Sequence, residues 1–415
     1  MSTEAATTGS ESAPRRIELI DALRGFALLG IIVVNVTFVA SAFKAVGLAD
    51  PDFAGTATDI VNWLVAIFFE TKFYLLFSFL FGYSFTIQLE SARRRGADFR
   101  ARFLRRLLGL AVLGFAHAIL LFLGDILVTY ALMGLILLAL RGLEPKRALQ
   151  VAAGVLLVTA AIYGLIGLAA LDSPEEFREK PAELALGVEE DEAAYSGSAG
   201  DVLDAQVADA ADSIIGILLI QGPSALAMFL VGLAAGKLRA LHEPERFRRL
   251  WKPMLLIGLA VGIPGGGLYA WGTIEAAMNH PARELFALAA ALLLAPFLTA
   301  AYVAAFALST HTGGGRLIQS ALAPAGRMAL TNYLLQSFVL AFIFTGYGAG
   351  LIGQVSPLGA IAIAFGVFLL QLPASAWWLK RFRYGPLEWV LRAFTNLAWP
   401  RWRVDRPAES QVTGR

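Results

Sequence analysis

The sequence predicts an all-α integral membrane protein with about ten transmembrane helices. Of its 415 residues, 57% are hydrophobic and only 16% are charged, whereas soluble domains carry about a quarter charged residues. The mean hydropathy is +0.65, and apolar segments of about 17–25 residues, long enough to cross a bilayer, recur along the chain. The loops between these segments alternate in charge. Such a chain could not cover its apolar surface in water.

Each apolar segment is expected to be one transmembrane helix, and the third and fourth form a tight hairpin. As a single helix, Leu107–Leu140 would be about 50 Å long at 1.5 Å per residue, too long for one crossing. We therefore expect a turn at Gly124 and Asp125. The predicted segments lie near Leu19–Phe43, Phe73–Leu89, Leu104–Leu123, Ile126–Leu140, Leu149–Leu171, Ile214–Gly236, Met254–Trp271, Leu285–Leu308, Ala325–Phe344 and Leu358–Leu379.

The charged residues divide between alternate loops in a way that orients the chain. Arginine and lysine clusters follow the second, fourth, sixth and tenth segments, whereas the long loop at residues 172–212 is acidic. The positive-inside rule then places both termini in the cytoplasm and the acidic loop outside. The Gly124–Asp125 turn falls on the outer side as well. The location that this pattern predicts is the plasma (inner) membrane.

Four regions are expected along the chain. Residues 1–14 and 404–415 are predicted to be disordered tails, and residues 15–384 to form the polytopic transmembrane domain. Residues 385–403 mix aromatic side chains, such as Trp389 and Phe394, with arginines, which suits an amphipathic segment lying on the cytoplasmic leaflet. Contact with a phosphorylated cytoplasmic donor is the alternative role for this segment.

Several classes of function are disfavoured by what the sequence lacks. There is no cysteine, so thiolate catalysis, disulfides and Cys-ligated metals are excluded. Apart from His117, the histidines are scattered over loops and predict no metal site. The arginine clusters are those that membrane topology requires, and nothing else indicates a nucleic-acid partner.

His117 and Asp125 lie in the predicted hairpin, at the depth where ionisable groups are costly and often functional. His117 falls about 9 Å below the outer end of its helix and is a candidate general base. The hairpin brings Asp125 near it, and Tyr130 lies slightly more than one turn deeper. The alternatives are an interhelical hydrogen bond for His117 and a helix N-cap for Asp125.

The first segment carries three polar residues on one helical stripe. Asp21 and Arg24 are three residues apart and can form a pair, and Asn35 follows Arg24 by almost a whole number of turns. In one interpretation Arg24 contacts an anionic cytoplasmic ligand. In the other, the Asp–Arg pair neutralises itself at the interface and Asn35 bonds to a neighbouring helix.

Two further segments supply candidate substrate-binding residues. Glu70 and Lys72 begin the second segment from outside, either as substrate contacts or as interfacial anchors. In the ninth segment Asn332 and Gln336 share a helical face, and Arg327 marks its cytoplasmic end. Interhelical hydrogen bonds are the alternative for both amides.

Several blocks, in order along the chain, resemble the YeiB-like family of bacterial multi-pass membrane proteins, long carried as a domain of unknown function. They are "RRIELIDALRGFALLGIIVVNV", "KFYLLFSFLFG", "LGFAHAILLFLGDILVTYALMG", "GRMALTNYLLQS" and "YGPLEWVLR". Within these blocks Lys72, His117, Asp125 and Tyr130 match the YeiB-like pattern.

The "DALRG" block, with Asp21, Arg24 and Gly25, is also similar to two groups of membrane acyltransferases. They are the heparan-α-glucosaminide N-acetyltransferases and the acyltransferase-3 type sugar O-acyltransferases. This resemblance implies a ten-helix transmembrane acyltransferase-like bundle. It also implies transfer of an acyl group from cytoplasmic acyl-CoA to a sugar on the far side, through an intramembrane histidine. Those acetyltransferases carry that histidine in a different local sequence.

The function that we expect is therefore an acyltransferase that works across the membrane. Acyl-CoA would be the co-substrate, with no metal, and a hydroxyl or amine of a sugar or envelope component the acceptor. His117 would act as base or acyl carrier, with Asp125 orienting it. The alternative is a transporter or flippase for a small or lipid-linked solute, or a membrane protein associated with transport. The expected partners are the bilayer, the acyl donor and the acceptor, and the oligomeric state stays open.

Overall fold

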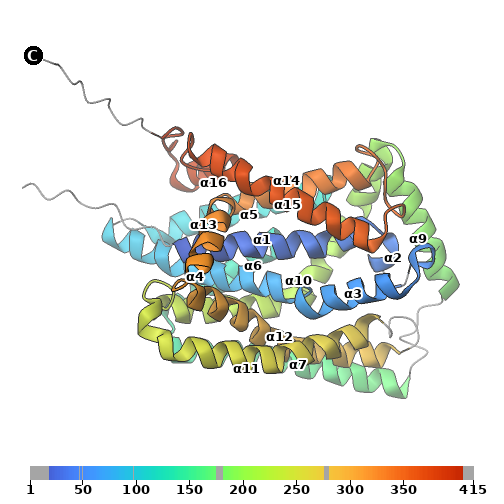
Figure 1. The fold of residues 1–415 in the computed structure, drawn as a ribbon, viewed down its shortest axis with the longest axis horizontal. Helices are drawn as coiled ribbons and strands as arrows, with labels where there is room; N and C mark the ends of the chain where they lie inside the picture. The colour runs from blue at the N-terminus through green and yellow to red at the C-terminus, as the bar shows by residue number, and fades with distance from the viewer. Residues whose placement is uncertain are drawn as a thin grey trace, which may run out of the picture.

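The computed structural model describes residues 18–45, 47–48, 50–96, 98–173, 181–274 and 280–404. Within these ranges the chain is built from helices, with no strand. The protein is an all-α, multi-pass membrane fold, as its composition predicts (Figure 1). The two predicted tails lie outside the described residues, apart from Val404.

Eight helical segments of the described chain are long and apolar enough to cross a membrane. They lie roughly along one direction, with α1 in the interior of the bundle (Figure 1). They are α1 (Glu18–Val39), α3 with α4 (Thr56–Phe68 and Lys72–Arg94), α5 (Phe99–Leu120), α7 (Pro145–Asp172), α10 (Ala199–Lys237), η3 with α11 (Pro244–Phe247 and Arg248–Ile274), α12 (Pro281–Ser309) and α15 (Pro357–Leu379).

Two of the predicted segments differ from a straight span. The fourth is the short helix α6 (Leu127–Ala139). The ninth is not one helix, because α13 (Gly313–Arg327) and α14 (Ala329–Phe344) meet at an angle of 79°. The predicted segment near Ala325–Phe344 therefore begins in the last turn of α13 and continues beyond the bend as α14. The Asn332 amide stabilises the bend by donating to the carbonyl of Ala325 over 3.0 Å.

The C-terminal segment supports this bend from outside. Helix α16 (Pro386–Asn396) places Glu388 against the first turn of α14, where its carboxylate accepts from the backbone amides of Leu330 at 2.7 Å and Thr331 at 3.1 Å. A carboxylate satisfies the free N–H groups of a helix start and complements the helix dipole. Burial raises the pKa of the Glu388 carboxyl. The backbone amides at the start of α14 are its structural partners.

The acidic stretch at residues 172–212 is not the loop that its charge suggested. It contains α9 (Pro181–Ser196) and the first part of α10. Ser198 and Asp201 form a reciprocal capping box that starts α10, and such a box stabilises a helix even in a polar sequence. The backbone oxygen of Tyr195 also accepts from the amide of Gly346 over 2.8 Å, which holds α9 on the loop after α14.

Asp191 makes the contact of α9 with α10 sensitive to pH. Burial, Asp209 and Glu190 raise the pKa of its carboxyl above the ordinary value. The Asp191 carboxyl therefore binds a proton more tightly in the folded chain than in the unfolded chain. The stability that this proton binding contributes is present at low pH and is lost as pH rises through the raised pKa. Asp191→Asn should therefore raise the melting temperature at pH 7, and the difference from wild type should shrink towards pH 4. Asp204→Asn, at an exposed position of α10, is the control. An equal effect of both variants at pH 7 would contradict the prediction.

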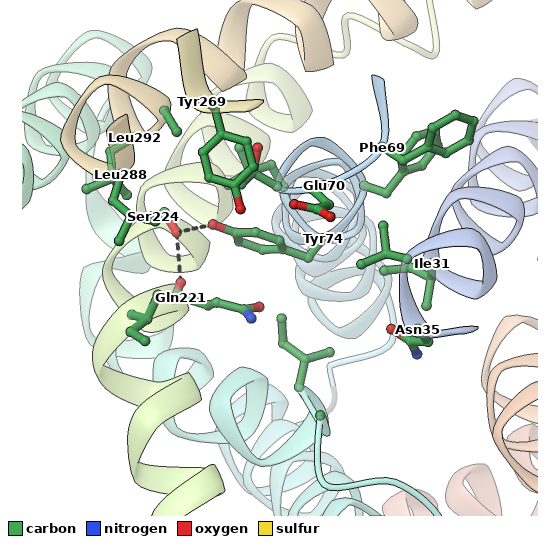
Figure 2. Close-up of a pocket in the computed structure, with 18 of the residues that line it drawn as sticks. Ile31, Asn35, Phe69, Glu70, Tyr74, Gln221, Ser224, Tyr269, Leu288 and Leu292 are labelled. Carbon is green, nitrogen blue, oxygen red and sulfur yellow. Dashed lines mark hydrogen bonds between the residues drawn. The ribbon is translucent and has the colours of Figure 1, made fainter. Parts of the chain in front are cut away.

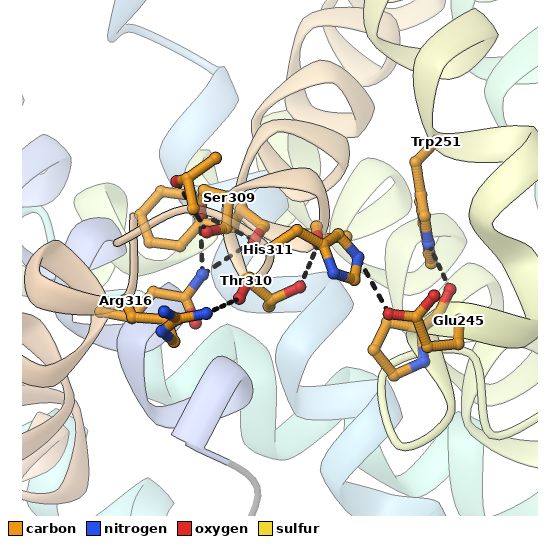
Figure 3. Close-up of polar contacts among 11 residues, drawn as sticks. Glu245, Trp251, Ser309, Thr310, His311 and Arg316 are labelled. Carbon is orange, nitrogen blue, oxygen red and sulfur yellow. Dashed lines mark hydrogen bonds and ion pairs between the residues drawn. The ribbon is translucent and has the colours of Figure 1, made fainter. Parts of the chain in front are cut away.

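The loops at the arginine-rich end are also tied together. Nε2 of His311, after α12, lies 3.1 Å from a carboxylate oxygen of Glu245 of η3 (Figure 3). Nδ1 of His242 forms a 2.7 Å hydrogen bond with the hydroxyl of Tyr83. The same hydroxyl accepts from the amide of Leu241 at 3.1 Å. Both loop histidines therefore hold connections between helices.

Candidate functional site

His117 and Asp125 meet as the hairpin predicts. The Nδ1 atom of His117, near the end of α5, lies 2.8 Å from Oδ2 of Asp125, and each residue is 1% exposed. The other carboxylate oxygen of Asp125 accepts from the amide of Val128 over 3.1 Å, in the first turn of α6. Gly114 permits this approach, because a Cβ there would press against Asp125. Asp125 thus both orients the imidazole and caps a helix.

This pairing determines which nitrogen of His117 is free to act. An ionised carboxylate can only accept, so opposite such a carboxylate Nδ1 is the donor, and in the neutral imidazole Nε2 is then the nitrogen with the lone pair. Among the described residues, Nε2 is buried and has no hydrogen-bond partner. The ring of Tyr333, from α14, lies beside it with 5.0 Å between the ring centroids. A buried lone pair on an oriented imidazole is the geometry of a general base.

Tyr130 does not join this pair. Its hydroxyl donates to the carbonyl of Tyr74 over 2.8 Å and accepts from Ser78 at 2.9 Å. These bonds connect α6 to α4, so the role of Tyr130 in the described chain is to hold two helices together.

A cavity of about 190 Å³ lies next to His117 and Asp125, but neither residue lines it. Tyr333, Gly124 and Ile126 do, so the wall that separates the pair from the cavity is the ring of Tyr333 and the hairpin turn. Small-molecule pockets commonly have volumes of about 300–1,000 Å³. This cavity therefore suits a small group rather than a whole coenzyme.

Polar side chains from four helical regions converge on the cavity. Figure 2 shows the carboxylate of Glu70, the amides of Asn35 and Gln221 and the hydroxyl of Tyr269 directed towards its centre. The hydroxyls of Tyr74 and Ser224, 2.9 Å apart, form one side. Asn35 and Glu70 are the predicted residues that the fold brings together here. The other lining residues were not predicted, although Gln221 and Ser224 are polar residues within an apolar segment of the sequence.

The break between α3 and α4 directs Glu70 into the cavity. Thr71 follows it with φ +68°, a conformation that is costly for a β-branched residue. Lys72, which is fully buried, donates over 2.8 Å to the carbonyl of Ala66 at the end of α3. Lys72 does not line the cavity. Instead its ammonium satisfies a free carbonyl at a helix C-terminus, where positive charge is favourable.

Asp21 and Arg24 lie at the other end of the bundle. They form an ion pair of 2.9 Å, and Arg24 also donates to the hydroxyl of Ser84. Arg327 ends α13 beside them, because neighbouring Gly326 packs against the backbone of Asp21. Arg24 and Asn35 share one stripe of α1, but their eleven-residue separation spans about 16 Å. The cavity does not reach Arg24.

Asn332 and Gln336 lie between α14 and α15 and do not line the cavity. Asn332 donates to the hydroxyl of Ser375 over 2.9 Å. Gln336 donates to the side chain of Gln371 over 2.8 Å, and Gln371 donates in turn to the carbonyl of Asn332 over 3.1 Å. These amides connect two helices in the apolar interior. In the described chain, no group of three or more His, Asp or Glu side chains could hold a metal ion.

Comparison with known proteins extends over nearly the whole chain. This chain is 34% identical over 407 residues to "Uncharacterized protein YxaH" of Bacillus subtilis, and the match covers 92% of this chain and 95% of that protein. It is 28% identical over 400 residues to "Uncharacterized protein YeiB" of Escherichia coli, covering 91% and 95%. The family described as "Protein of unknown function (DUF418)" matches residues 235–398. No solved structure matches.

Proposed function

The chain belongs to the YeiB-like family of membrane proteins, and from that premise we propose that it is a transmembrane acyltransferase of the plasma membrane. The observation that carries the proposal is the buried pair of His117 and Asp125 with a free Nε2. An imidazole that is oriented by a carboxylate and unpaired on its other nitrogen is the arrangement that activates a hydroxyl or amine for acyl transfer.

The proposed reaction uses the pair as a base. Nε2 of His117 takes a proton from the acceptor while the acceptor's oxygen or nitrogen forms a bond to the thioester carbonyl of acyl-CoA. The C–S bond then breaks, and the imidazolium returns the proton to the departing thiolate. Asp125 stabilises the imidazolium through its 2.8 Å contact with Nδ1. No redox partner is needed.

The two substrates would approach from opposite ends. The small cavity at Asn35 and Glu70 suits the reacting group of an extracytoplasmic acceptor. The phosphates of acyl-CoA would meet Arg24 and the arginines at the cytoplasmic end, because guanidinium groups bind phosphate well. Since Tyr333 stands between the cavity and His117, its ring must move for the acceptor to reach Nε2.

A sealed-vesicle assay tests this function. With labelled acetyl-CoA on the cytoplasmic side and envelope extract on the other, we expect label to become covalently attached to an acceptor on the far side. Vesicles that lack the protein are the control. Label that crosses only as an unmodified solute would favour a transporter, and label that stays on coenzyme A in every preparation would overturn the proposal.

A further inference from the structure

The cavity carries a negative charge that the proposed reaction does not use. Among the described residues that line the cavity, Glu70 is the only acidic one and none is basic. Its side chain is only 7% exposed. A carboxylate in such a place is costly unless a cation is paired with it. A cation is therefore expected beside the carboxylate of Glu70.

The protein supplies that cation itself, from the rim. Lys44, on the four-residue helix α2 (Ala42–Ala45), places Nζ 2.9 Å from the carboxylate of Glu70. The side chain of Lys44 is 24% exposed and does not line the cavity. Its ammonium also lies 5.9 Å from the ring centre of Phe38, which does. Lys44 thus reaches Glu70 from a partly exposed position.

The rest of the wall suits an ammonium group as well. Aromatic rings attract cations placed over their faces, and Phe69, Tyr74 and Tyr269 line the cavity around Glu70 (Figure 2). One protein ammonium already uses this property, since Nζ of Lys72 lies 5.3 Å from the ring centre of Tyr269. The ammonium of Lys72 also donates to the carbonyl of Ala66.

We propose that the cavity binds a small ligand with an ammonium group, which replaces Lys44 on the carboxylate of Glu70. The amides of Asn35 and Gln221 then bind the polar remainder of the ligand, and the aromatic rings enclose the cation. The ligand occupies the same cavity that the proposed function gives to the acceptor, so on that function the acceptor is an amine-bearing molecule. Binding itself requires no acyl transfer.

An equilibrium binding measurement on the full chain in lipid nanodiscs tests this inference. The probes are choline, ethanolamine and 3,3-dimethylbutan-1-ol, the neutral isostere of choline. We expect at least one of the two amines to bind at least about ten-fold more tightly than the isostere, as the loss of a desolvated cation–π contact implies. Equal binding of amine and isostere, or no binding of either amine, overturns the proposal.

Two variants locate the site. Glu70→Gln should remove the preference for the amine, and Lys44→Met should increase amine affinity several-fold because it removes the internal competitor. Lys252→Met, at an exposed position on α11, is the matched control and should change nothing. If Lys44→Met weakens amine binding, or if Glu70→Gln keeps the preference, the inference is wrong. Coenzyme A is absent from this experiment, so failure here leaves transfer to a hydroxyl acceptor intact in the vesicle assay.

Discussion

Replacing His117 with alanine should lower acyl transfer about 10²–10⁴-fold, the range that a general base contributes. The loss should fall on turnover rather than on acceptor binding, because His117 lies behind the cavity wall and not in it. The measurement is the sealed-vesicle assay, with each rate divided by the amount of protein that elutes as a single folded species.

Asp125→Asn separates the chemical role of the pair from its structural one. Asparagine keeps an oxygen for the amide of Val128, so the cap on α6 is retained. It loses the charge that fixes the tautomer of His117 and stabilises the imidazolium. We expect this variant to melt near the wild-type temperature, with a reduced rate and a shifted pH–rate profile. Wild-type rates in both His117→Ala and Asp125→Asn would leave the pair a structural contact only.

The second large effect is expected where α4 crosses α10. A Cβ at Gly82 would collide with the backbone oxygen of Phe229, and one at Gly232 with that of Phe79. Backbone atoms cannot rotate away as a side chain can, so the helices must separate. Small residues at such crossings let membrane helices pack closely. Gly82→Val should therefore destabilise the protein by at least about 1–3 kcal/mol, the usual cost of overpacking.

Thermal unfolding in detergent checks this expectation, read as loss of the monodisperse species after heating. Gly267→Ala in α11 is the control, since apart from its chain neighbours and its own helix backbone no described atom lies within 4 Å of the added Cβ. Alanine suits a helix better than glycine, so this variant should keep or raise the melting temperature. Equal melting of Gly82→Val and Gly267→Ala would show that the crossing tolerates a wider separation.

Hydropathy predicted the helices because its cause is local. A segment must be apolar along its own length to cross a bilayer, whatever its neighbours are. Hence all ten predicted segments correspond to helical structure, and the hairpin at Asp125 follows from length alone. The failures lie where the cause is tertiary. At the bend before α14, the first turn of the helix is capped by Glu388, which is 58 residues from Leu330 in sequence.

The residues of the candidate site show the same difference between local and tertiary causes. Asn35 and Glu70 were identified as polar residues at membrane depth, and the fold brings both to one cavity. Lys72, only two residues from Glu70, does not line the cavity and instead donates to the carbonyl of Ala66. Asn332 and Gln336 met the same sequence criterion and connect α14 to α15 instead. A polar residue within a transmembrane segment is expected to have a partner. Only the packing of the helices shows which group that partner is.

The sequence by itself determined that this is a membrane protein, where its apolar helical segments lie and that His117 and Asp125 meet. Each of these follows from composition or from contacts a few residues apart. Tertiary structure alone decided that Tyr333 stands between that pair and the cavity, and that Lys44 neutralises Glu70 within it. Those contacts join helices distant in sequence, and the free energy of packing side chains against one another selects them.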